Sequence, residues 1–559
     1  MERVCAVSGQ KFEITDEDLR FYEKIAGEVG GVPVPSLCPN ERGRRRWAWR
    51  GKELCMRDCD KCGENVMSWF PPELGRAGFE SAGLVTYCDE CFRAEEFDAL
   101  EYGREFDFER PFFEQFFEMA RQVPRHISNS INNVNSEYII SSHRNKNCYF
   151  MDELDYCWDC YFGYNIQHSK NIVESIFVRD SEIGYDLAKA ENCYAVFCSH
   201  NVFHCSDSAF LMNCRGCKKC LFCANLRQKE YHILNRPVSK EEFENVWKEI
   251  FCGRRSALED ARRRFAEFLK DQSFPAGILI KTEESSGNYL SNCKNVKDSY
   301  WVDNCKDCRY CTDIHFSRDC YDVNIYEGEM LYECIHAGPK GYGQICSQLA
   351  WFSSDVWYCL ELRSCRDLFG CAGLKNQQYC ILNRQYSKDE YFDLRARIVE
   401  HMRETGEWGE FFPIEYSPYP YNVTMAQRFH PLSREEVVGR GWKWLDEEDA
   451  VVGESRGEVP DDFGSIEDLD EFSQRVFVCA ESGKKFKFVK AELKFYKQYG
   501  LPLPVVAPTV RIEGMWKKMG ERRLRECVCS DCGEVVSTTF GEDFEGKILC
   551  EKCYLKVVW

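Results

Sequence analysis

Several features that mark common protein classes are missing from this sequence. There is no run of about 18 apolar residues, so we expect no membrane span. The first residues, MERVCAVSGQKFEI, hold no apolar signal core, and we therefore expect a cytoplasmic protein. Histidine is scarce, with 10 residues in 559, and no catalytic triad, Gly-rich phosphate loop or clustered carboxylate pair stands out. The balance favours a protein that is not an enzyme, and no small-molecule substrate can be identified.

Positive charge is also in short supply. The formal net charge is −19, which excludes a chain built as a whole to coat nucleic acid. Cysteine, in contrast, is abundant, with 35 residues. In a secreted protein these would form a disulfide framework, whereas in a cytoplasmic protein they act as metal ligands or as small buried hydrophobes.

The cysteines recur in a repeat that begins near Lys146 with KNCYFMDELDYC and WDCYFGYNIQHS. We call the third position of each segment the anchor. Successive anchors lie 10 to 12 residues apart from Cys148 to Cys217, and the phase returns later at Val296. A gap of 36 residues, equal to three steps of 12, separates two of the later anchors. Such a short and regular period indicates a solenoid, in which each unit stacks on the next. The anchors are Cys148, Cys160, Ile172, Ile183, Cys193, Cys205, Cys217, Val296, Cys308, Cys320, Val356 and Leu368.

The residues around the anchors predict a parallel β-helix. Asn or Asp precedes many of them, as at Asn147, Asp159, Asn192, Asp307 and Asp319, and these residues tolerate tight turns. Tyr, Phe and Val follow, as strands prefer. Twelve residues suffice for one short strand and a turn, so we expect two units to form one coil of about 24 residues. The predicted fold class is mainly β with α insertions: a duplicated parallel β-helix-like solenoid of about 12-residue units, with a small zinc-ribbon module at each end.

The duplication is visible in a shared closing segment, YxILNRxxSKxE. A serine is followed three residues later by glutamate in both copies, at Ser239 and Glu242 and at Ser387 and Glu390. This pattern is a capping box that begins a helix. The first helix is expected to run from about 240 to 270.

Two pairs of cysteine hooks predict structural zinc sites. Each hook is a Cys-x2-Cys motif, and two hooks supply the four thiolates of a tetrahedral site with no open position for catalysis. A glycine follows the first hook in both modules, at Gly63 and Gly533, where a tight turn needs a permissive residue. We expect two structural Zn²⁺ ions. Their ligands are Cys59, Cys62, Cys88 and Cys91 at one end, and Cys529, Cys532, Cys550 and Cys553 at the other.

Cys5 and Cys38 are the remains of an incomplete site. Ser8 and Glu41 stand where two further cysteines would complete the hooks, so this set makes a poor zinc cage that could still hold a metal weakly. The C-terminal module repeats the pattern with Cys479 and Ser482, but no residue replaces Cys38.

A basic segment, ERGRRRWAWRGK, precedes the first pair of complete hooks. Basic residues interleaved with aromatics can hold phosphate and stack bases, which makes this segment a candidate nucleic-acid contact. The alternative is a solvated face of a small zinc domain, and the acidic charge of the whole chain favours it. The candidate contact residues are Arg44, Arg45, Arg46, Trp47 and Trp49.

The cysteines within the repeat have two interpretations. Cys214, Cys217, Cys220 and Cys223 resemble a ferredoxin-type iron–sulfur run, although the last step of the spacing differs. Because isoleucine and valine occupy equivalent anchors, buried rows of thiols are favoured over clusters.

The expected domain boundaries follow from these patterns. We expect an N-terminal incomplete site plus ribbon (1–100), a capping helix for the first coil (101–126), the first solenoid half (127–236) and a helical segment (237–283). These are followed by the second solenoid half (284–386), a helix (387–415), an irregular strap with an acidic, solvated linker (416–470), and the C-terminal module (471–559).

At CDKCGENV, at the NCY-type repeats and at FxCANLRxKEYxILN, the chain resembles an uncharacterised protein family of candidate-phyla-radiation (Patescibacteria-type) bacteria. That resemblance implies zinc-ribbon modules around a cysteine-rich repeat and no established activity.

Taken together, the sequence favours a zinc-binding cytosolic scaffold or binding protein whose partner is a macromolecule, either protein or RNA. Nucleic acid or the ribosome would be engaged through the basic, Trp-containing segments beside the ribbons. The alternative is a β-helix enzyme acting on a polysaccharide, or an iron–sulfur or thiol redox protein.

Overall fold

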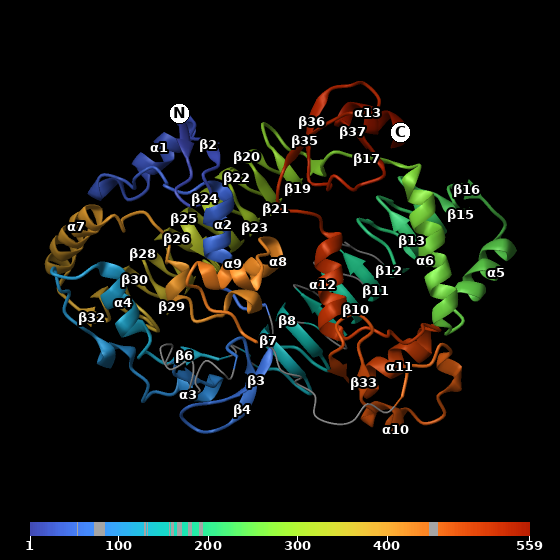
Figure 1. The fold of residues 1–559 in the computed structure, drawn as a ribbon, viewed down its shortest axis with the longest axis horizontal. Coiled ribbons are helices and arrows are strands. Elements are labelled where there is room, and N and C mark those ends of the chain that lie inside the picture. Colours follow the sequence, from blue (N-terminus) through green and yellow to red (C-terminus); the bar gives the residue numbers. More distant parts are fainter. Residues whose placement is uncertain are drawn as a thin grey trace. The chain divides into compact units, whose positions relative to one another are not determined.

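The chain forms two units, each assembled from distant parts of the sequence, in a computed structural model. Unit 1 contains Met1–Ser128 and Gly277–Leu445, and unit 2 contains Asn129–Ala276 and Asp446–Trp559. Strands and helices take comparable shares of the chain, so the fold is mixed rather than mainly β (Figure 1). The structure describes residues 1–52, 54–71, 84–127, 130, 132–155, 157, 161–164, 170–176, 182–188, 194–446 and 457–558.

Unit 1 combines the N-terminal modules with a stack of short parallel strands that we call the second stack. The N-terminal elements are β1 (Glu2–Val4), β2 (Lys11–Glu13), α1 (Asp16–Lys24), α2 (Pro39–Trp47), β3 (Cys55–Asp58), β4 (Asn65–Ser68), β5 (Thr86–Tyr87), α3 (Asp89–Arg93), α4 (Phe112–Ala120) and β6 (Arg125–His126). The second stack contains β18 (Leu279–Ile280), β19 (Gly287–Ser291), β20 (Lys294–Lys297), β21 (Ser299–Asp303), β22 (Lys306–Arg309), β23 (Thr312–His315), β24 (Arg318–Tyr326), β25 (Gly328–Ile335), β26 (Gly341–Ile345), β27 (Gln348–Trp351), β28 (Ser354–Trp357), β29 (Leu360–Arg363), β30 (Arg366–Phe369), β31 (Gln378–Ile381) and β32 (Arg384–Gln385). The helices α7 (Lys388–Thr405), α8 (Met425–Phe429) and α9 (Arg434–Gly439) follow.

Unit 2 combines the first stack with the C-terminal module. The first stack contains β7 (Glu137–His143), β8 (Tyr149–Asp155), β9 (Tyr161–Tyr164), β10 (Lys170–Ile176), β11 (Glu182–Ala188), β12 (Tyr194–Phe197), β13 (Ser206–Met212), β14 (Lys218–Ala224), β15 (Glu230–Ile233) and β16 (Arg236–Pro237). It is followed by α5 (Lys240–Ile250), α6 (Arg255–Lys270) and β17 (Ser273–Pro275). The C-terminal elements are α10 (Leu469–Gln474), β33 (Phe477–Val478), β34 (Lys485–Phe486), α11 (Lys490–Tyr499), α12 (Pro508–Lys518), β35 (Arg525–Val528), β36 (Val535–Thr538), β37 (Lys547–Leu549) and α13 (Glu551–Val558).

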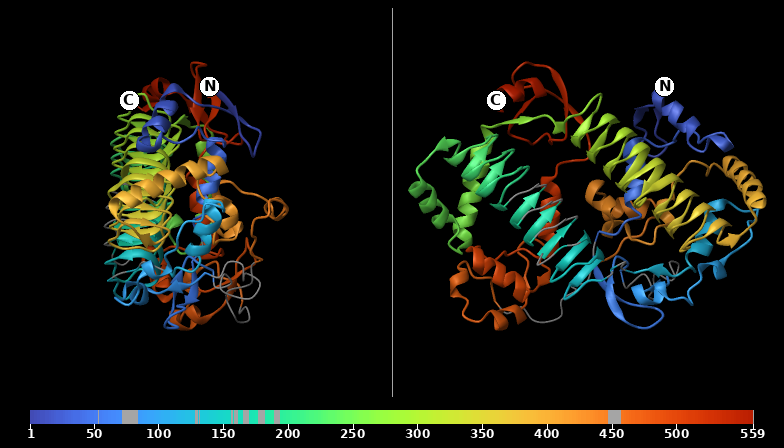
Figure 2. Two further views of the ribbon diagram at one scale, coloured as in Figure 1. Left: turned by 90° about the vertical axis from the view of Figure 1, so that its left-hand side faces the viewer. Right: turned by 180° about the vertical axis from the view of Figure 1, so that it is seen from behind.

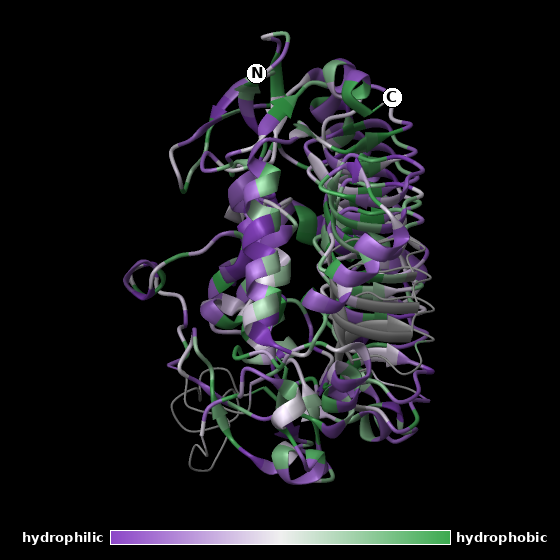
Figure 3. Ribbon diagram, turned by 90° about the vertical axis from the view of Figure 1, so that its right-hand side faces the viewer, coloured by the Kyte–Doolittle hydropathy of each residue, from purple (hydrophilic) through white to green (hydrophobic). Residues whose placement is uncertain are grey.

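In both stacks the chain pairs with itself in parallel after one repeat of the sequence, except that the closing strands β16 and β32 pair antiparallel with β15 and β31. Val296 lies opposite Cys308, which lies opposite Cys320. The expected coil of about 24 residues is therefore wrong, because 12 residues already complete one coil. The strands of each stack lie one above another like rungs (Figure 2), and hydrophilic residues occupy many of the turns along the stacks (Figure 3).

A left-handed backbone conformation at every third residue explains how so few residues can close a coil. Positive φ angles occur at Asn304, Asp307, Tyr310, Asp313 and Phe316, each three residues after the last. Each such residue turns the chain sharply, so a coil has four corners and four sides of three residues. Asn and Asp adopt this conformation more readily than other non-glycine residues, which confirms the turn role predicted for Asn147, Asp307 and Asp319.

Short sides leave a narrow interior that only one small side chain from each side can fill. In the second stack the inward positions include Cys305, Cys308, Cys311 and Ile314, all almost completely buried. The Cys308 thiol donates a hydrogen bond to the Lys306 carbonyl at 3.2 Å, and the Ser299 hydroxyl donates in the same way to Lys297 at 2.7 Å. Cysteine and serine therefore both fill this space and satisfy inward-facing carbonyl groups.

The anchors whose side chains the structure describes are buried, but the register differs in part from the expectation. Ile172 pairs with Gly184 and Gly184 with Val196, so the step stays at 12 where shorter steps were expected, and Gly184 takes the position expected for Ile183. The buried anchors are Cys148, Cys205, Cys217, Val296, Cys308, Cys320, Val356 and Leu368. A shift of three residues moves from one side of the coil to the next, which also points inward. This is why Cys205 and Cys217 matched the pattern while lying on a different side from Ile172. Cys160, Cys193, Asp159 and Asn192 lie outside the described residues.

In the second stack the 36-residue gap contains three coils, as predicted. Their steps are unequal: Cys320 pairs with Leu331, and Leu331 with Gln344. Tyr342 pairs with Ser354, which places Gln344 opposite Val356. The buried amide of Gln344 donates to the carbonyl groups of Ala350 and Ser353, where the longer coil leaves extra space.

The helical segments after each stack differ in one respect from those predicted from the sequence. Ser387 and Glu390 form the predicted capping box of α7, and the Ser239 hydroxyl accepts from the Glu242 amide at the start of α5. The single helix expected over 240–270 is instead two helices, α5 and α6. Gly253, with φ of 81°, lies between them and allows the chain to turn.

Two further expectations about packing are corrected. Helix α4 does not cover the first coil, because Phe112 packs against Tyr358 and Phe369 of the second stack. The described end of the acidic linker is not simply solvated. Phe463 and Ile466 are buried there, and Asp461 accepts hydrogen bonds from Ser256 at the start of α6.

The narrow interior predicts a size limit at Cys308. Replacing Cys308 by Val should change stability by less than about 1.5 kcal/mol, because Val296 already occupies the adjacent position of the same row. Replacing Cys308 by Phe should cost about 3 kcal/mol or more, because an added ring has no space. The midpoints of thermal unfolding of the two variants provide the comparison. Equal midpoints would show that the interior is not filled as described.

Candidate metal centres

The first cluster forms where a hairpin turn meets the start of a helix. Strands β3 and β4 pair antiparallel, and the turn between them carries Cys59 and Cys62. The Cys59 amide donates to the Glu64 carbonyl at 2.8 Å, and Gly63, with φ of 76°, donates back to Cys59. Cys88 precedes the first residue of α3, and Cys91 lies one turn further along. Local backbone structure therefore directs all four thiols toward one point.

The second cluster repeats this construction at the other end of the chain. The turn between β35 and β36 carries Cys529 and Cys532, with the same hydrogen bond from Cys529 to Glu534 at 2.8 Å. Cys550 precedes the first residue of α13 and Cys553 lies within it. The amide of Cys550 donates to the Cys529 sulfur at 3.2 Å, as that of Cys88 donates to the Cys59 sulfur at 3.2 Å.

The sulfur atoms in each cluster are spaced to hold one metal ion. All four lie within 4.8 Å of one another in both groups. The Sγ–Sγ distance is 3.7 Å for Cys62 and Cys88 and 3.7 Å for Cys532 and Cys550. A tetrahedral zinc site with Zn–S bonds of about 2.3 Å requires sulfur atoms about 3.8 Å apart. Both predicted ligand sets are therefore brought together in a geometry that suits a metal.

The electrostatics of each cluster favour a thiolate in the turn. Burial opposes ionisation of Cys59, but backbone N–H donors from Cys88 and Cys62 outweigh it and lower the pKa of that thiol to about 7. Burial likewise opposes ionisation of Cys529, where donors from Cys532 and Cys550 lower the pKa to about 6. Burial and a hydrogen bond with Cys62 raise the pKa of Cys91 to about 11. A bound cation would hold all four thiols as thiolates and displace their protons.

The incomplete site keeps the backbone of the complete ones but not their ligands. Cys5 lies in an equivalent turn, and Cys38 precedes α2 as Cys88 precedes α3. The Ser8 hydroxyl lies 3.8 Å from the Cys38 sulfur. Glu41 is not available as a fourth ligand, because Arg44 donates to both of its carboxylate oxygens at 2.5 and 2.6 Å. Within the described residues, Cys5 and Cys38 are not part of a group of three or more ligands.

The C-terminal copy of this incomplete site has lost one more thiol. The Cys479 sulfur accepts hydrogen bonds from the amides of Ser482 at 3.4 Å and Ala507 at 3.3 Å. Ala507 precedes α12 where Cys38 precedes α2. The amide donors that support a metal-binding thiolate elsewhere thus remain, while the opposing ligand is absent.

The basic segment is buried rather than exposed to a nucleic acid. Most of it forms α2, which packs against β24 and β25 of the second stack. Arg46 is 2% exposed, and Trp47 and Trp49 are 3% and 1% exposed. Arg44 and Arg45 are also buried. Neither the nucleic-acid contact expected for these residues nor the alternative of a solvated face fits this position.

The arginines are buried because carboxylates meet them. Arg46 donates to Asp322 at 3.0 Å and to Glu333 at 2.8 Å, and Arg45 donates to Glu333 at 2.9 Å. Asp322 and Glu333 are fully buried corner residues of adjacent coils. Arg42 adds a bond to Asp322 at 2.9 Å. A buried charge is tolerated only when it is paired in this way.

Trp49 joins α2 to the surrounding helices. Its ring stacks on Phe117 of α4 with 5.3 Å between ring centroids, and its indole N–H donates to the Phe412 carbonyl at 3.1 Å. The sequence pattern identified the arginines and tryptophans as special. It did not identify Asp322 or Glu333 as partners of the arginines, because single acidic residues are scattered throughout the coils.

The cysteine run from Cys214 to Cys223 is part of the interior of the first stack. Its four cysteines are three residues apart, so each lies on the next side of the coil. All four thiols are almost completely buried. Cys214 and Cys223 donate to the carbonyl groups of Met212 and Leu221, two residues earlier in each case. The spacing that resembles an iron–sulfur motif therefore arises from the length of one side of the coil.

Comparison with known proteins gives no further assignment. No protein-family model matches the chain, and no curated protein matches its sequence. No helix in the described part of the chain has the length and apolar character needed to cross a membrane.

The buried ion pairs predict a large effect of removing one charge. Glu333→Gln should destabilise unit 1 by about 3–5 kcal/mol, because Arg45 and Arg46 would lose their shared carboxylate in a buried position. Thermal or denaturant unfolding of the full chain measures the loss. Glu118→Gln, which removes an exposed partner of Arg110, is the matched control and should leave stability nearly unchanged. Similar unfolding of the two variants would contradict the role given to Glu333.

Proposed function

We propose that the protein is a non-catalytic, zinc-binding scaffold in which metal ions fix the ends of two β-solenoid stacks. The observation that carries this proposal is the pair of four-thiol clusters, each with sulfur atoms within 4.8 Å of one another. Four protein thiolates fill a tetrahedral zinc site and leave no position for a substrate or water. A structural role for the metal follows.

The strands next to the clusters support this role. Strand β5, which leads into Cys88, pairs in parallel with β6. Strand β37, which leads into Cys550, pairs in parallel with β17. Both β6 and β17 lie just before a boundary between the two units. Each cluster therefore fixes the segment through which the chain leaves its unit.

The described thiols support a reducing compartment, which we propose is the cytoplasm. None of the described cysteines forms a disulfide, and most are buried. The outer faces of the stacks, with their polar corner residues, would be available to a protein or RNA partner. Repeat proteins use such extended faces for binding.

Metal content tests the proposal directly. We expect two zinc ions per chain by elemental analysis of the purified protein, and about one in the variants Cys62→Ser and Cys532→Ser. A Cys5→Ser variant is the matched control and should retain two, because Cys5 and Cys38 lack further ligands. Protein that folds fully without zinc, or that contains iron in its place, would overturn the proposal.

Limited proteolysis tests the structural role of each metal separately. Cys62→Ser should increase cleavage near residue 128, and Cys532→Ser should increase it near residue 276, because each cluster supports the adjacent strand pair. Mass spectrometry of the early fragments locates the cuts. Identical cleavage patterns for both variants and the parent protein would mean that the clusters do not hold these segments.

A further inference from the structure

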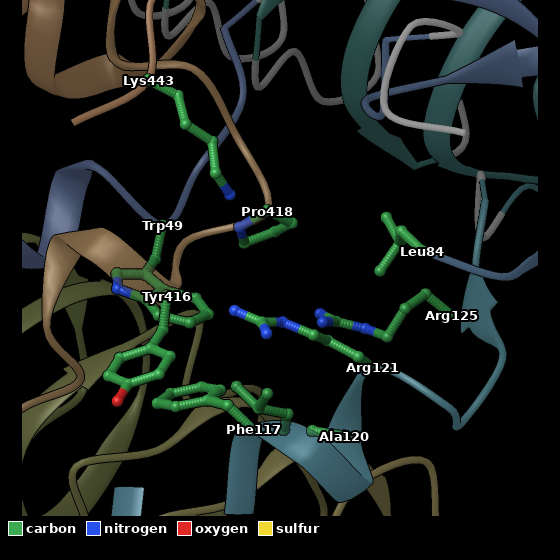
Figure 4. Close-up of a pocket in the computed structure, with 10 residues that line it drawn as sticks. Trp49, Leu84, Phe117, Ala120, Arg121, Arg125, Tyr416, Pro418 and Lys443 are labelled. Atoms are coloured by element: carbon green, nitrogen blue, oxygen red, sulfur yellow. The ribbon is translucent and has the colours of Figure 1, made fainter. Parts of the chain in front are cut away.

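A hollow in unit 1 combines three cations with aromatic walls. It lies between α4, the segment around residues 416–418 and the second stack, and Figure 4 shows the guanidinium groups of Arg121 and Arg125 directed into it, with Lys443 on another side. Its lining contains no carboxylate. The lining residues are Trp49, Leu84, Phe117, Ala120, Arg121, Arg125, Leu360, Tyr416, Pro418 and Lys443.

Arg121 forms no ion pair within the described part of the chain, although its charge acts on Glu118, one turn earlier in the sequence. It is the residue at the C-terminal end of α4, where it is half-buried. Its guanidinium lies 5.8 Å from the centre of the Tyr416 ring, and its side chain makes no hydrogen bond or ion pair with a described residue. Five N–H donors are thus held at the edge of a hollow without an acceptor.

Lys443 is a second cation that pairs with no carboxylate among the described residues. Its ammonium donates to the Ser417 carbonyl at 2.9 Å. Burial, and then repulsion from Arg121, lower the pKa of Lys443 to about 8. The third cation differs, because Arg125 is buried and paired with Glu361 at 2.5 Å. The hollow therefore holds an excess of positive charge that its own residues do not balance.

The size of the hollow limits what could balance this charge. The cavity volume is about 20 Å³, and a volume of about 10–15 Å³ on this measure holds one water molecule. A single small charged group fits such a space, whereas a whole nucleotide does not. Planar guanidinium groups bind phosphate-type oxygens through two parallel N–H bonds.

We propose that this hollow binds a small tetrahedral oxyanion of the phosphate or sulfate class between Arg121 and Lys443. The anion would accept hydrogen bonds from the guanidinium and the ammonium, while Tyr416 and Phe117 exclude water from one side. Arg125 would contribute charge but remain bonded to Glu361. Anion binding would also favour the protonated form of Lys443. This site is independent of the two metal clusters.

The experiment uses full-length, zinc-loaded protein and inorganic phosphate. Phosphate should raise the midpoint of thermal unfolding in a saturable way, while chloride at the same ionic strength should not. Arg121→Gln and Lys443→Gln should each weaken phosphate binding at least tenfold by titration calorimetry. Arg110→Gln is the control, because this nearby arginine lies in exposed ion pairs outside the hollow. Equal effects of phosphate and chloride, or unchanged affinity in both hollow variants, would overturn the proposal.

A second measurement keeps the test decisive if one variant folds poorly. Calorimetry at pH 8 in buffers of different ionisation enthalpy should show proton uptake on phosphate binding, because the anion raises the pKa of Lys443. The charged groups in its surroundings are Arg121 and the pair of Arg125 with Glu361. Lys443→Gln should abolish the uptake. Uptake of the same size in that variant would assign the proton elsewhere and exclude Lys443 from the site.

A matched pair of ligands distinguishes free phosphate from a phosphoryl group on a larger molecule. Phenyl phosphate carries the same oxyanion on a flat ring that could contact the half-buried Tyr416. Tighter binding of phenyl phosphate than of inorganic phosphate, lost in Arg121→Gln, would identify the phosphoryl group of a larger ligand as the occupant. Equal binding of the two, with the same loss, would identify the free anion.

Discussion

The width of a 12-residue coil is the constraint on which the stacks depend. Four sides of three residues leave room for four small inward side chains, and each corner requires a backbone conformation that most residues avoid. Repeated cysteine and serine meet the first need, because they are small and donate to the inward carbonyl groups. Asn and Asp meet the second need at many corners. The abundance of cysteine in the repeat is therefore a consequence of geometry. Among the described residues, the thiol groups that could hold a metal ion are the eight cysteines of the two end modules.

The end modules show how one backbone can be kept while its ligands change. Cys59 and Cys529 lie in turns that direct amide groups at a sulfur, and so do Cys5 and Cys479. Where the opposing cysteines are missing, ion pairs hold the module in place. Glu41 pairs with Arg44, and α2 is held by its buried arginines rather than by a metal. Ion pairs and thiolate clusters thus serve as alternative ways to fix a small module against a stack.

The repeat period, the inward anchors and both ligand sets could be predicted from the sequence because they depend on local spacing. The same spacing concealed the coil size. Because inward positions recur every three residues, a step that is three residues short moves from the side of Ile172 to another side of the coil and still matches the anchor pattern. The three-residue spacing of Cys214 to Cys223 was the signal for the length of a side. The burial of Arg46 could not be predicted, because its partners Asp322 and Glu333 are almost 300 residues away in the chain. Charge composition alone does not reveal such pairs.

The composition of unit 1 has a consequence for protein synthesis. Arg42 and its partner Asp322 are 280 residues apart, and much of unit 2 is encoded between them. A ribosome that adds about 5–20 residues per second needs roughly 15–55 s to reach the second residue after making the first. During that interval the arginines of α2 have no carboxylates from the second stack. The N-terminal segment can therefore complete its packing only after the second stack has been synthesised. Until then it can be no more than partly folded around its own cysteine cluster.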